Sequence, residues 1–295
     1  MATIARHNCK LDQRENSLPP NRAQLPLPLP FLDNPHLPVL HPAKSYPLRH
    51  ARMTQDGIFD ANVARTYDRD HGGTDAGEVA RTVDCLVDLA AKGPVLEFAI
   101  GTGRIALPLA ATGISVKGIE LSRAMVDELR KKETGAPMEV AIGDMTTTKV
   151  PGAFALVYLV FNTIDNLTTQ DAQIACFRNA AAHLAPGGRF VIETQLPQIQ
   201  RLPFGETRIA FAADADHFGV DEIDVASQSY TSHHVWLKED GPSHVSVPFR
   251  YAWPAEMDLM ARLAGMELEH RWADWDRAPF DRYSRKHISV WTKTS

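Results

Sequence analysis

The sequence predicts a doubly wound α/β domain, in which helices cover both faces of a largely parallel sheet. Short apolar runs alternate with amphipathic segments from about residue 75 to residue 194. These runs are apolar almost throughout, which is typical of strands buried on both faces. From residue 196 to residue 250 the pattern changes to a two-residue alternation bounded by Gly, Pro and Asp, which predicts antiparallel hairpins. We therefore expect a small antiparallel β lid beside the main sheet.

The alternating part of the chain predicts strands separated by helices. The apolar runs that we expect as strands cover residues 94–99, 114–118, 138–142, 153–161 and 189–194. The helices are expected from apolar residues at helical spacing, and they cover residues 75–92, 105–112, 122–132 and 169–184. Gly93 ends the first of these helices, Ser122 begins the third as its N-cap, and the PGG at 186–188 ends the fourth.

The chain after the lid returns to the main sheet. A last helix is expected from about Pro254, a favoured first-turn residue, to Gly265. Two closing strands follow, at residues 266–275 and 285–293, and they form a hairpin. One domain is thus predicted over residues 53–295, with residues 196–250 inserted as the lid.

The first 52 residues differ in composition from the rest of the chain. They hold nine of the 20 prolines, and proline neither continues a helix nor donates to a central sheet ladder. They also hold seven Lys/Arg and three Asp/Glu, a formal charge of +4, whereas the whole chain carries −5. We expect a disordered tail or translated upstream sequence over residues 1–52, and a polyproline II ligand for a partner is the alternative.

Overall composition excludes several classes of protein. A 44% hydrophobic and 23% charged content does not fit a wholly disordered chain, and no apolar run approaches the roughly 18 residues that a membrane span needs. The mild acidity does not favour a nucleic-acid partner. Cys9, Cys85 and Cys176 form no CxxC pair, which argues against disulfides and structural zinc and favours a cytoplasmic setting.

The residues that carry chemistry lie at the ends of the first three strands. A glycine-containing turn, IGTGR, follows the first strand and leaves room for a ligand to approach the backbone. Glu97 precedes this turn, and Glu120 ends the second strand, where a carboxylate can accept both hydroxyls of a ribose. Gly143, Asp144 and Met145 follow the third strand and offer a carboxylate beside an apolar wall to an adenine amino group.

Together these residues resemble the class I S-adenosylmethionine-dependent methyltransferases, and the resemblance covers the chain from about Gln55 to Ser295. It is strongest to the small-molecule branch, which includes glycine and amino-sugar N-methyltransferases. The first motif of the family, an acidic residue and then G-x-G-x-G, matches Glu97, Ala99, Gly101 and Gly103, so that Ala99 replaces the first glycine. The resemblance implies a Rossmann-like sheet with a reversed last strand and S-adenosyl-L-methionine as cofactor.

The resemblance also implies roles for individual residues. Glu120 would hold the ribose, Leu121 and Met145 would enclose the adenine, and Asp144 would bind its amino group. Further residues expected at the cofactor are Glu97, Ala99, Gly101, Gly103, Met125, Phe161 and Asn162, the last two bordering the methionine moiety. Tyr67, in the segment RTYDRDHGG, either approaches the cofactor or packs against the first helix.

Two alternatives share part of this pattern. An NAD-dependent Rossmann oxidoreductase needs the glycine turn and the distal acid, but it calls for neither Glu97 nor the GDM after the third strand. It would also have a sixth parallel strand instead of the closing hairpin. A non-catalytic S-adenosylmethionine-binding protein is the second alternative.

Candidate bases for catalysis lie in the predicted lid, because His titrates near neutral pH. His217 is expected in a loop with acidic neighbours. His233 and His234 lie on an alternating strand and therefore point to opposite faces, and we expect His234 to face the substrate. No metal site is expected, since pairs such as Asp274 and Asp276 are typical of turn carboxylates. The sequence thus predicts a methyltransferase that acts on a nitrogen or oxygen of a small-molecule acceptor, while its oligomeric state stays open.

Overall fold

The computed structural model describes residues 59–71, 76–238 and 241–294 of the 295-residue chain. All of these residues belong to one compact unit, His50–Ser295. The tail predicted over residues 1–52 lies outside the described residues. Among the helices of the described part, none is long and apolar enough to cross a membrane.

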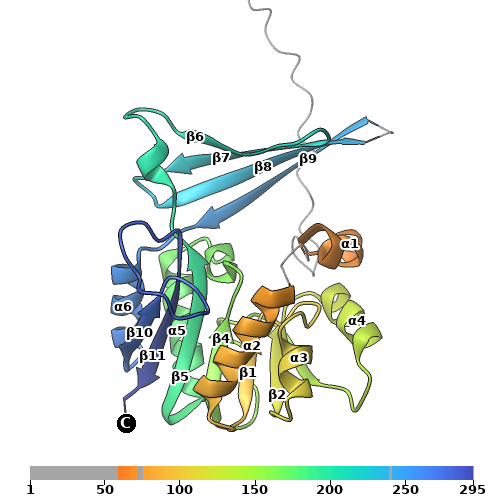
Figure 1. Ribbon diagram of the computed structural model, residues 1–295, viewed down its shortest axis with the longest axis vertical. Helices are drawn as coiled ribbons and strands as arrows, with labels where there is room; N and C mark the ends of the chain where they lie inside the picture. The colour runs from red at the N-terminus through yellow and green to blue at the C-terminus, as the bar shows by residue number, and fades with distance from the viewer. Residues whose placement is uncertain (1–58, 72–75, 239–240, 295) are drawn as a thin grey trace, which may run out of the picture. The chain divides into compact units, whose positions relative to one another are not determined.

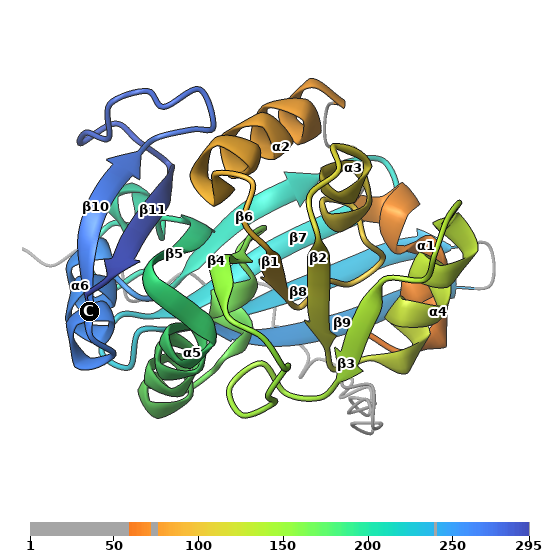
Figure 2. The same cartoon turned by 90° about the horizontal axis from the view of Figure 1, so that it is seen from below.

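A seven-stranded central sheet forms the body of this unit (Figures 1 and 2). Its strands are β1 (Val95–Phe98), β2 (Val116–Glu120), β3 (Glu139–Ile142), β4 (Phe154–Leu159), β5 (Leu184–Gln195), β10 (Met266–Trp272) and β11 (Lys286–Lys293). They lie in the order β10-β11-β5-β4-β1-β2-β3. The five strands from β1 to β5 pair in parallel, whereas β11 is antiparallel to both β5 and β10. The predicted sheet with its reversed last strand is confirmed.

Helices cover both faces of this sheet, as the continuous apolar runs predicted. The helices are α1 (Ala61–His71), α2 (Ala76–Ala90), α3 (Ala106–Ala111), α4 (Arg123–Lys132), α5 (Gln170–His183) and α6 (Pro254–Leu263), with short 3-10 helices η1 (Thr163–Asn166) and η2 (Ile199–Arg201). Figure 2 shows α2 and α3 on one side of the sheet and α5 and α6 on the other. Leu86 of α2 packs in the first core cluster and Phe177 of α5 in the second.

Local signals in the sequence set several boundaries of these elements. The Ser122 hydroxyl accepts the Met125 N–H at 3.2 Å and begins α4, as predicted. The expected end of β5 is correct but its expected beginning is wrong, because β5 starts at Leu184 and includes the PGG at 186–188. The pairing register between β4 and β5 shifts at this point, so the PGG forms a bulge inside the strand and not a turn before it.

A separate four-stranded antiparallel sheet follows β5 in the chain. It consists of β6 (Arg208–Ala213), β7 (His217–Asp224), β8 (Ser229–Lys238) and β9 (Gly241–Arg250) in sequential order. Figure 1 shows it lying across the carboxyl ends of the central strands. The Tyr230 hydroxyl of β8 donates to Asp165 Oδ2 of η1 at 3.0 Å, so the face that carries Tyr230 is turned toward the central sheet. The antiparallel hairpins predicted for residues 196–250 are thus present.

Candidate active site

The glycine turn between β1 and α3 has an unusual backbone conformation. Ala99, Gly101 and Gly103 all have positive φ angles, of 52°, 56° and 77°. Glycine adopts this region freely, but alanine does so at a cost of about 1–2 kcal/mol. Ala99, which replaces the first glycine of the motif, therefore strains the backbone of the turn. At Gly103 a Cβ atom would lie 3.0 Å from Cγ of Leu129, so the turn also needs a small residue there.

Glu120 is fixed at the carboxyl end of β2 by backbone donors. Its Oε2 accepts the N–H of Gly101 at 2.8 Å, and its Oε1 accepts the N–H of Ser122 at 2.9 Å. The side chain is buried, with 5% of its surface exposed. The residue after β3, Gly143, donates its N–H to the Glu120 carbonyl at 2.8 Å. The glycine turn, Glu120 and the GDM segment therefore meet at one edge of the sheet.

Glu97 lies buried beside this carboxylate at the end of β1. Burial raises the pKa of Glu97 to about 8, although the Tyr158 hydroxyl, which donates to it at 2.6 Å, and Arg104 both act to lower it. The negative charge of Glu120 raises this pKa further. At neutral pH the Glu97 carboxyl therefore holds a proton, and a cationic group bound beside it would favour its ionised form.

Helix α1 lies over the glycine turn and brings Tyr67 to the same place. Burial raises the pKa of Tyr67. The positive charge of Arg104 acts to lower this pKa, whereas the negative charges of Glu120 and Glu97 act to raise it. Next to it, Asp68 accepts hydrogen bonds from the Thr102 hydroxyl and the Lys132 ammonium, both at 2.6 Å. These bonds tie α1, which carries Tyr67, to the glycine turn and to α4.

The residues expected around the adenine lie at the ends of β2 and β3. Leu121 is 50% exposed, while Met125 is buried. The Cε atom of Met125 approaches the glycine turn so closely that a side chain in place of Gly101 would put its Cβ atom 3.4 Å away. Asp144 is exposed, and its Oδ1 accepts the Thr146 N–H at 2.7 Å. Met145 packs partly buried against the second core cluster. These four residues thus follow β2 and β3 at the carboxyl edge of the sheet, with Leu121 and Asp144 open to solvent.

The turn after β4 is strained at two successive residues. Phe161 and Asn162 have φ angles of 60° and 59°, a left-handed conformation that non-glycine residues rarely adopt. Glu193 at the end of β5 accepts the Phe161 N–H at Oε2 over 3.2 Å, and Asn162 Oδ1 accepts the Gln195 N–H over 2.6 Å. The Arg104 guanidinium lies 4.1 Å from the centre of the Phe161 ring. Backbone strain of this kind is characteristic of functional sites.

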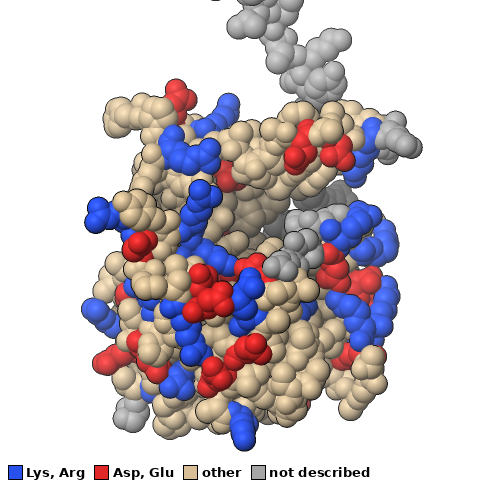
Figure 3. All heavy atoms as spheres, viewed as in Figure 1, with Lys and Arg blue, Asp and Glu red and all other residues tan. Residues whose placement is uncertain are grey.

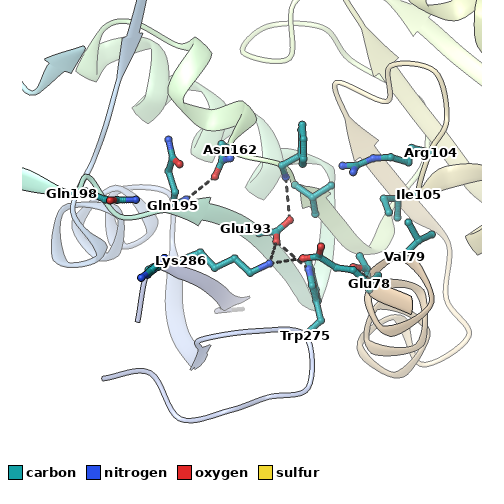
Figure 4. A pocket seen from close by; sticks show the side chains of 14 residues that line it. Glu78, Val79, Arg104, Ile105, Asn162, Glu193, Gln195, Gln198, Trp275 and Lys286 are labelled. Carbon is teal, nitrogen blue, oxygen red and sulfur yellow. Dashed lines mark hydrogen bonds and ion pairs between the residues drawn. The ribbon is translucent and has the colours of Figure 1, made fainter. Parts of the chain in front are cut away.

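A cavity of about 300 Å³ opens beside this turn (Figure 4). It is lined by side chains from α2, from the segment after the glycine turn, from the turn after β4, from β5 and from the β10–β11 connection. The lining residues include Glu78, Arg104, Phe161, Asn162, Glu193, Gln195, Trp275 and Lys286. Figure 3 shows a hollow beneath the β6–β9 sheet, with both acidic and basic side chains along its rim.

Charged side chains converge on one wall of this cavity. The Lys286 ammonium lies 2.6 Å from Glu78 Oε1 and 2.8 Å from Glu193 Oε1, and the Trp275 indole N–H donates to the same Glu193 oxygen at 3.2 Å. Of the residues that line the cavity, only Phe161 and Asn162 were predicted from the sequence as site residues. Glu78, Glu193, Trp275 and Lys286 were missed because they lie in four segments that no local motif connects.

The three candidate histidines lie on the β6–β9 sheet. His217 begins β7, so the expectation of a loop at this residue is wrong. His217 Nε2 and His234 Nδ1 are 3.0 Å apart, and both rings stack with Trp236 on the face that also carries Tyr230. His233 is on the opposite face, with Nδ1 2.9 Å from the Ser246 hydroxyl. The predicted division of His233 and His234 between the two faces is present, and none of the residues described as lining the cavity is a histidine.

The acidic pairs and cysteines have ordinary surroundings. Asp274 Oδ1 accepts the N–H groups of Asp276 and Ala278, both at 3.0 Å, which is the arrangement of a turn carboxylate. Cys85 and Cys176 are free and buried. Within residues 59–71, 76–238 and 241–294 there is no group of three or more His, Cys, Asp or Glu side chains that could hold a metal ion.

A parallel sheet with a reversed β11, a glycine turn after β1 and an acid at the end of β2 define a Rossmann-like nucleotide-binding protein. Comparison with known proteins narrows this class. Residues 95–188 match a family described as a methyltransferase domain. The structure of the CcbJ methyltransferase from Streptomyces caelestis is 36% identical to this chain, with a TM-score of 0.70, and the match covers 79% of this chain and 96% of CcbJ.

Two curated relatives extend the comparison. The cypemycin N-terminal methyltransferase of Streptomyces sp is 27% identical over 201 residues, which cover 66% of this chain and 81% of that protein. A dTDP-3-amino-3,6-dideoxy-alpha-D-glucopyranose N,N-dimethyltransferase of Streptomyces fradiae is 30% identical over 141 residues, which cover 46% of this chain and 54% of that protein. The chain belongs to the class I S-adenosylmethionine-dependent methyltransferases, and S-adenosylmethionine is its cofactor. The resemblance seen in the sequence is confirmed, and the oxidoreductase alternative is not supported.

The residues present at the carboxyl edge fit this cofactor. S-adenosylmethionine carries a positive sulfur and a ribose with two free hydroxyls. Glu97 and Glu120 supply two carboxyl groups at this edge, where a bound positive charge would offset the burial that raises the pKa of Glu97, and Tyr67 supplies an aromatic ring whose hydroxyl is acted on by both acids. Glu120 is held by two backbone donors, which give its carboxylate a defined direction.

Proposed function

We propose that this methyltransferase acts on the amine of a small-molecule acceptor, which it binds in the cavity beside Phe161 and Asn162. The observation that carries this proposal is the position of the cavity. Two of its lining residues, Phe161 and Asn162, belong to the strained turn that the family resemblance places next to the methionine moiety. An acceptor in the cavity would therefore lie against the reacting end of the cofactor.

Each predicted cofactor residue takes a part in this proposal. Glu120 would bind the ribose hydroxyls, while Leu121, Met125 and Met145 would contact the adenine and Asp144 its amino group. The backbone at Ala99, Gly101 and Gly103 would lie along the cofactor, because its left-handed conformation turns the chain away from the cleft. Glu97 and Tyr67 would face the methionine end, which is where the positive charge lies.

The bound cofactor supplies a methyl carbon that is activated by the positive sulfur. The protein's part is to place the acceptor nitrogen in line with this carbon, at about 3–3.5 Å, and to keep water out. Phe161, Val160 and Trp275 present apolar surface to the cavity, and the amide groups of Asn162, Gln195 and Gln198 present polar surface. We propose that the amides bind polar groups of the acceptor and that the aromatic rings exclude water.

Deprotonation of the acceptor is assigned to the inward-facing histidines. An amine attacks only in its neutral form, so a base is needed when it binds protonated. His234 and His217 share a hydrogen bond on the face turned toward the central sheet, whereas His233 lies on the outer face beside Glu222. We therefore keep His234, with His217 as its partner, as the proposed base, and His233 becomes the weaker choice. Because neither His234 nor His217 lines the cavity, the proton would pass from the acceptor to His234 through a bridging water.

The relatives support nitrogen as the attacked atom. One relative is named an N-terminal methyltransferase and two are named N,N-dimethyltransferases of amino sugars. The proposal can be tested by incubating the protein with methyl-labelled S-adenosylmethionine and a panel of amino-sugar nucleotides, peptides with free N-termini and amino alcohols. We expect a labelled N-methyl product with at least one amine, and Glu120→Ala should abolish it. Label only on hydroxyl groups, or binding of cofactor without any transfer across the panel, would contradict the proposal.

Two further expectations concern the whole chain. We propose a catalytic domain over residues 53–295 that works without residues 1–52, with residues 196–250 acting as its lid. We also propose a cytoplasmic setting, which the free thiols of Cys85 and Cys176 support. Deletion of residues 1–52 should leave the methyl transfer rate unchanged, and a loss of activity would favour the alternative in which this segment binds a partner.

A further inference from the structure

Glu193 occupies a central position between the acceptor cavity and the strained turn after β4. The residue is buried, with 9% of its surface exposed, although it carries a carboxylate. Its two oxygens have different tasks. Oε2 accepts the backbone N–H of Phe161, while Oε1 accepts the Trp275 indole and the Lys286 ammonium (Figure 4). One side chain thus connects the backbone of the turn to the β10–β11 connection and β11.

The turn needs such an anchor because its conformation is unfavourable by itself. Phe161 and Asn162 are both left-handed, and a phenylalanine in this region clashes with its own backbone. Such a conformation persists only where surrounding contacts hold it. The backbone carbonyl of Glu193 also accepts the Asn162 N–H, at 3.2 Å, so both amide groups of the strained pair bind the same residue.

We propose that Glu193 is a positioning residue, which holds the Phe161–Asn162 turn in its left-handed conformation and thereby places the Phe161 ring between the cofactor cleft and the acceptor cavity. Trp275 and Lys286 in turn hold the Glu193 carboxylate. The position of the ring is also fixed on its other side, where the Arg104 guanidinium stacks 4.1 Å from its centre. The role of Glu193 in holding the turn does not depend on the proposed function. Its effect on methyl transfer rests on that function.

Substitutions at Glu193 separate positioning from simple stability. In Glu193→Gln the side chain keeps its shape but has one acceptor oxygen in place of two. We expect this oxygen to face the two donors Trp275 and Lys286, one of them charged, so that the N–H₂ group meets the Phe161 N–H and the turn loses its side-chain anchor. Glu193→Ala removes the side-chain anchor of the Phe161 N–H and leaves only the bond from the Asn162 N–H to the backbone carbonyl of residue 193. Lys286→Met leaves the bond to Phe161 in place but loosens the carboxylate, so its effect should be smaller.

Glu269→Gln is a matched control on the same sheet. Glu269 of β10 pairs with Arg189 at 2.8 Å, near the opposite end of β5, and does not line the cavity. The change from carboxylate to amide and the loss of an ion pair are the same as in Glu193→Gln. Any general effect of weakening the β5 region should therefore appear in both variants.

Amide hydrogen exchange of Phe161 and Asn162 is the measurement, made on the full chain by NMR or by mass spectrometry of the peptide that spans them. We expect exchange at these amides to speed up about tenfold or more in Glu193→Gln and Glu193→Ala, less in Lys286→Met, and not in Glu269→Gln. Exchange across β4, at Phe154–Leu159, should stay slow in all variants. Unchanged exchange in both Glu193 variants, or equal acceleration in Glu269→Gln, would overturn the proposal.

A second readout connects the turn to catalysis. The dissociation constant of S-adenosylhomocysteine, measured by calorimetry, should stay within about threefold of wild type in Glu193→Gln, because Glu120 and the glycine turn are unchanged. The methyl transfer rate at saturating substrates should fall about tenfold or more, since small displacements at a reacting centre are costly. A wild-type rate in a variant with accelerated exchange would show that the turn does not position the reaction. If no amine is methylated by the wild type, the proposed function fails, while the exchange experiment still decides the role of Glu193.

Discussion

The proposed cofactor cleft and the proposed acceptor cavity both lie at the carboxyl edge of one sheet, but they are built differently. The cleft is made from short consecutive segments at the ends of β1, β2 and β3, and backbone groups fix its key side chain, Glu120. The cavity is made from side chains of at least five separate segments, and other side chains fix its key carboxylate, Glu193. Substitution of side chains leaves the backbone groups of the first site in place, so its ligand can stay the same. In the second site the same kind of substitution can change which ligand binds.

The comparison predicts that the two regions fail in different ways. Damage to the cleft should abolish binding of the cofactor, while damage to the cavity should leave the cofactor bound and disturb transfer. The sheet of β6–β9 belongs to the second region, because its Tyr230 reaches Asp165 next to the strained turn.

Glu120→Ala should have the largest effect. It removes the carboxylate proposed to accept two ribose hydroxyls, and hydrogen bonds to charged groups contribute roughly 1.5–3 kcal/mol each. We expect a loss of roughly 3–6 kcal/mol in the binding free energy of S-adenosylhomocysteine, measured by isothermal titration calorimetry. Glu139→Ala is the control. Glu139 begins β3, the strand next to β2, and so lies at the amino end of the parallel strands, away from Glu120; among the described residues it forms an ion pair only with Lys117. Equal affinity in Glu120→Ala and wild type would remove Glu120 from the site.

Asp165→Asn should change how stability depends on pH. Burial raises the pKa of Asp165 from 3.8 to about 7, so the folded protein keeps a proton there that the unfolded chain has lost. The stabilising contribution of this proton is complete below about pH 4 and is lost as pH rises through 7. Between pH 5 and 8 the wild type should therefore lose about 2–3 kcal/mol of unfolding free energy relative to Asp165→Asn.

Urea denaturation of both proteins at pH 5, 6, 7 and 8 measures this difference. Glu269→Gln serves as control, because Arg189 lowers the pKa of Glu269 to about 2. The ionised Glu269 carboxylate contributes its full share to the unfolding free energy above about pH 4.5, and this share is lost only as pH falls through 2. The contribution is therefore constant between pH 5 and 8. A wild type and an Asp165→Asn variant with parallel pH profiles would show that Asp165 is ionised throughout.

Ala99→Gly should have the smallest effect and the opposite sign. Glycine relieves the left-handed strain of about 1–2 kcal/mol, while it adds about 0.4–1 kcal/mol of chain entropy to the unfolded state. We expect a net stabilisation of about 0.5–1 kcal/mol, seen as a melting temperature higher by a few degrees. The same substitution in a helix, Ala110→Gly in α3, should destabilise by about 0.5–1 kcal/mol. Destabilisation by both substitutions would mean that Ala99 is not strained.

The sequence predicted the cleft well because its parts are local. Glu97, Gly101 and Gly103 lie within seven residues of one another, and Ser122 identifies the start of α4 through a capping rule that acts over three residues. The strand order could not be worked out from these patterns alone; the family resemblance implied the reversed last strand, and β11 confirms it. The PGG was misplaced because a bulge depends on the partner strand β4, which local sequence does not show.

The cavity could not be predicted in the same way. Lys286 and Glu78 are more than 200 residues apart in the chain, and only the folded sheet brings them within 2.6 Å. Glu193 lies in an ordinary apolar strand pattern, so its central role follows from the bonds it makes and not from its neighbours in the sequence. His217 and His234, which local composition favoured, lie outside the residues that line the cavity.

A crystal structure of the full chain with S-adenosylhomocysteine would show directly which region holds which ligand. We expect ribose hydroxyls within hydrogen-bonding distance of Glu120, the sulfur beside Phe161, and the cavity between Trp275 and Lys286 left open for the acceptor. Ligand density inside that cavity, or a ribose away from Glu120, would contradict this expectation.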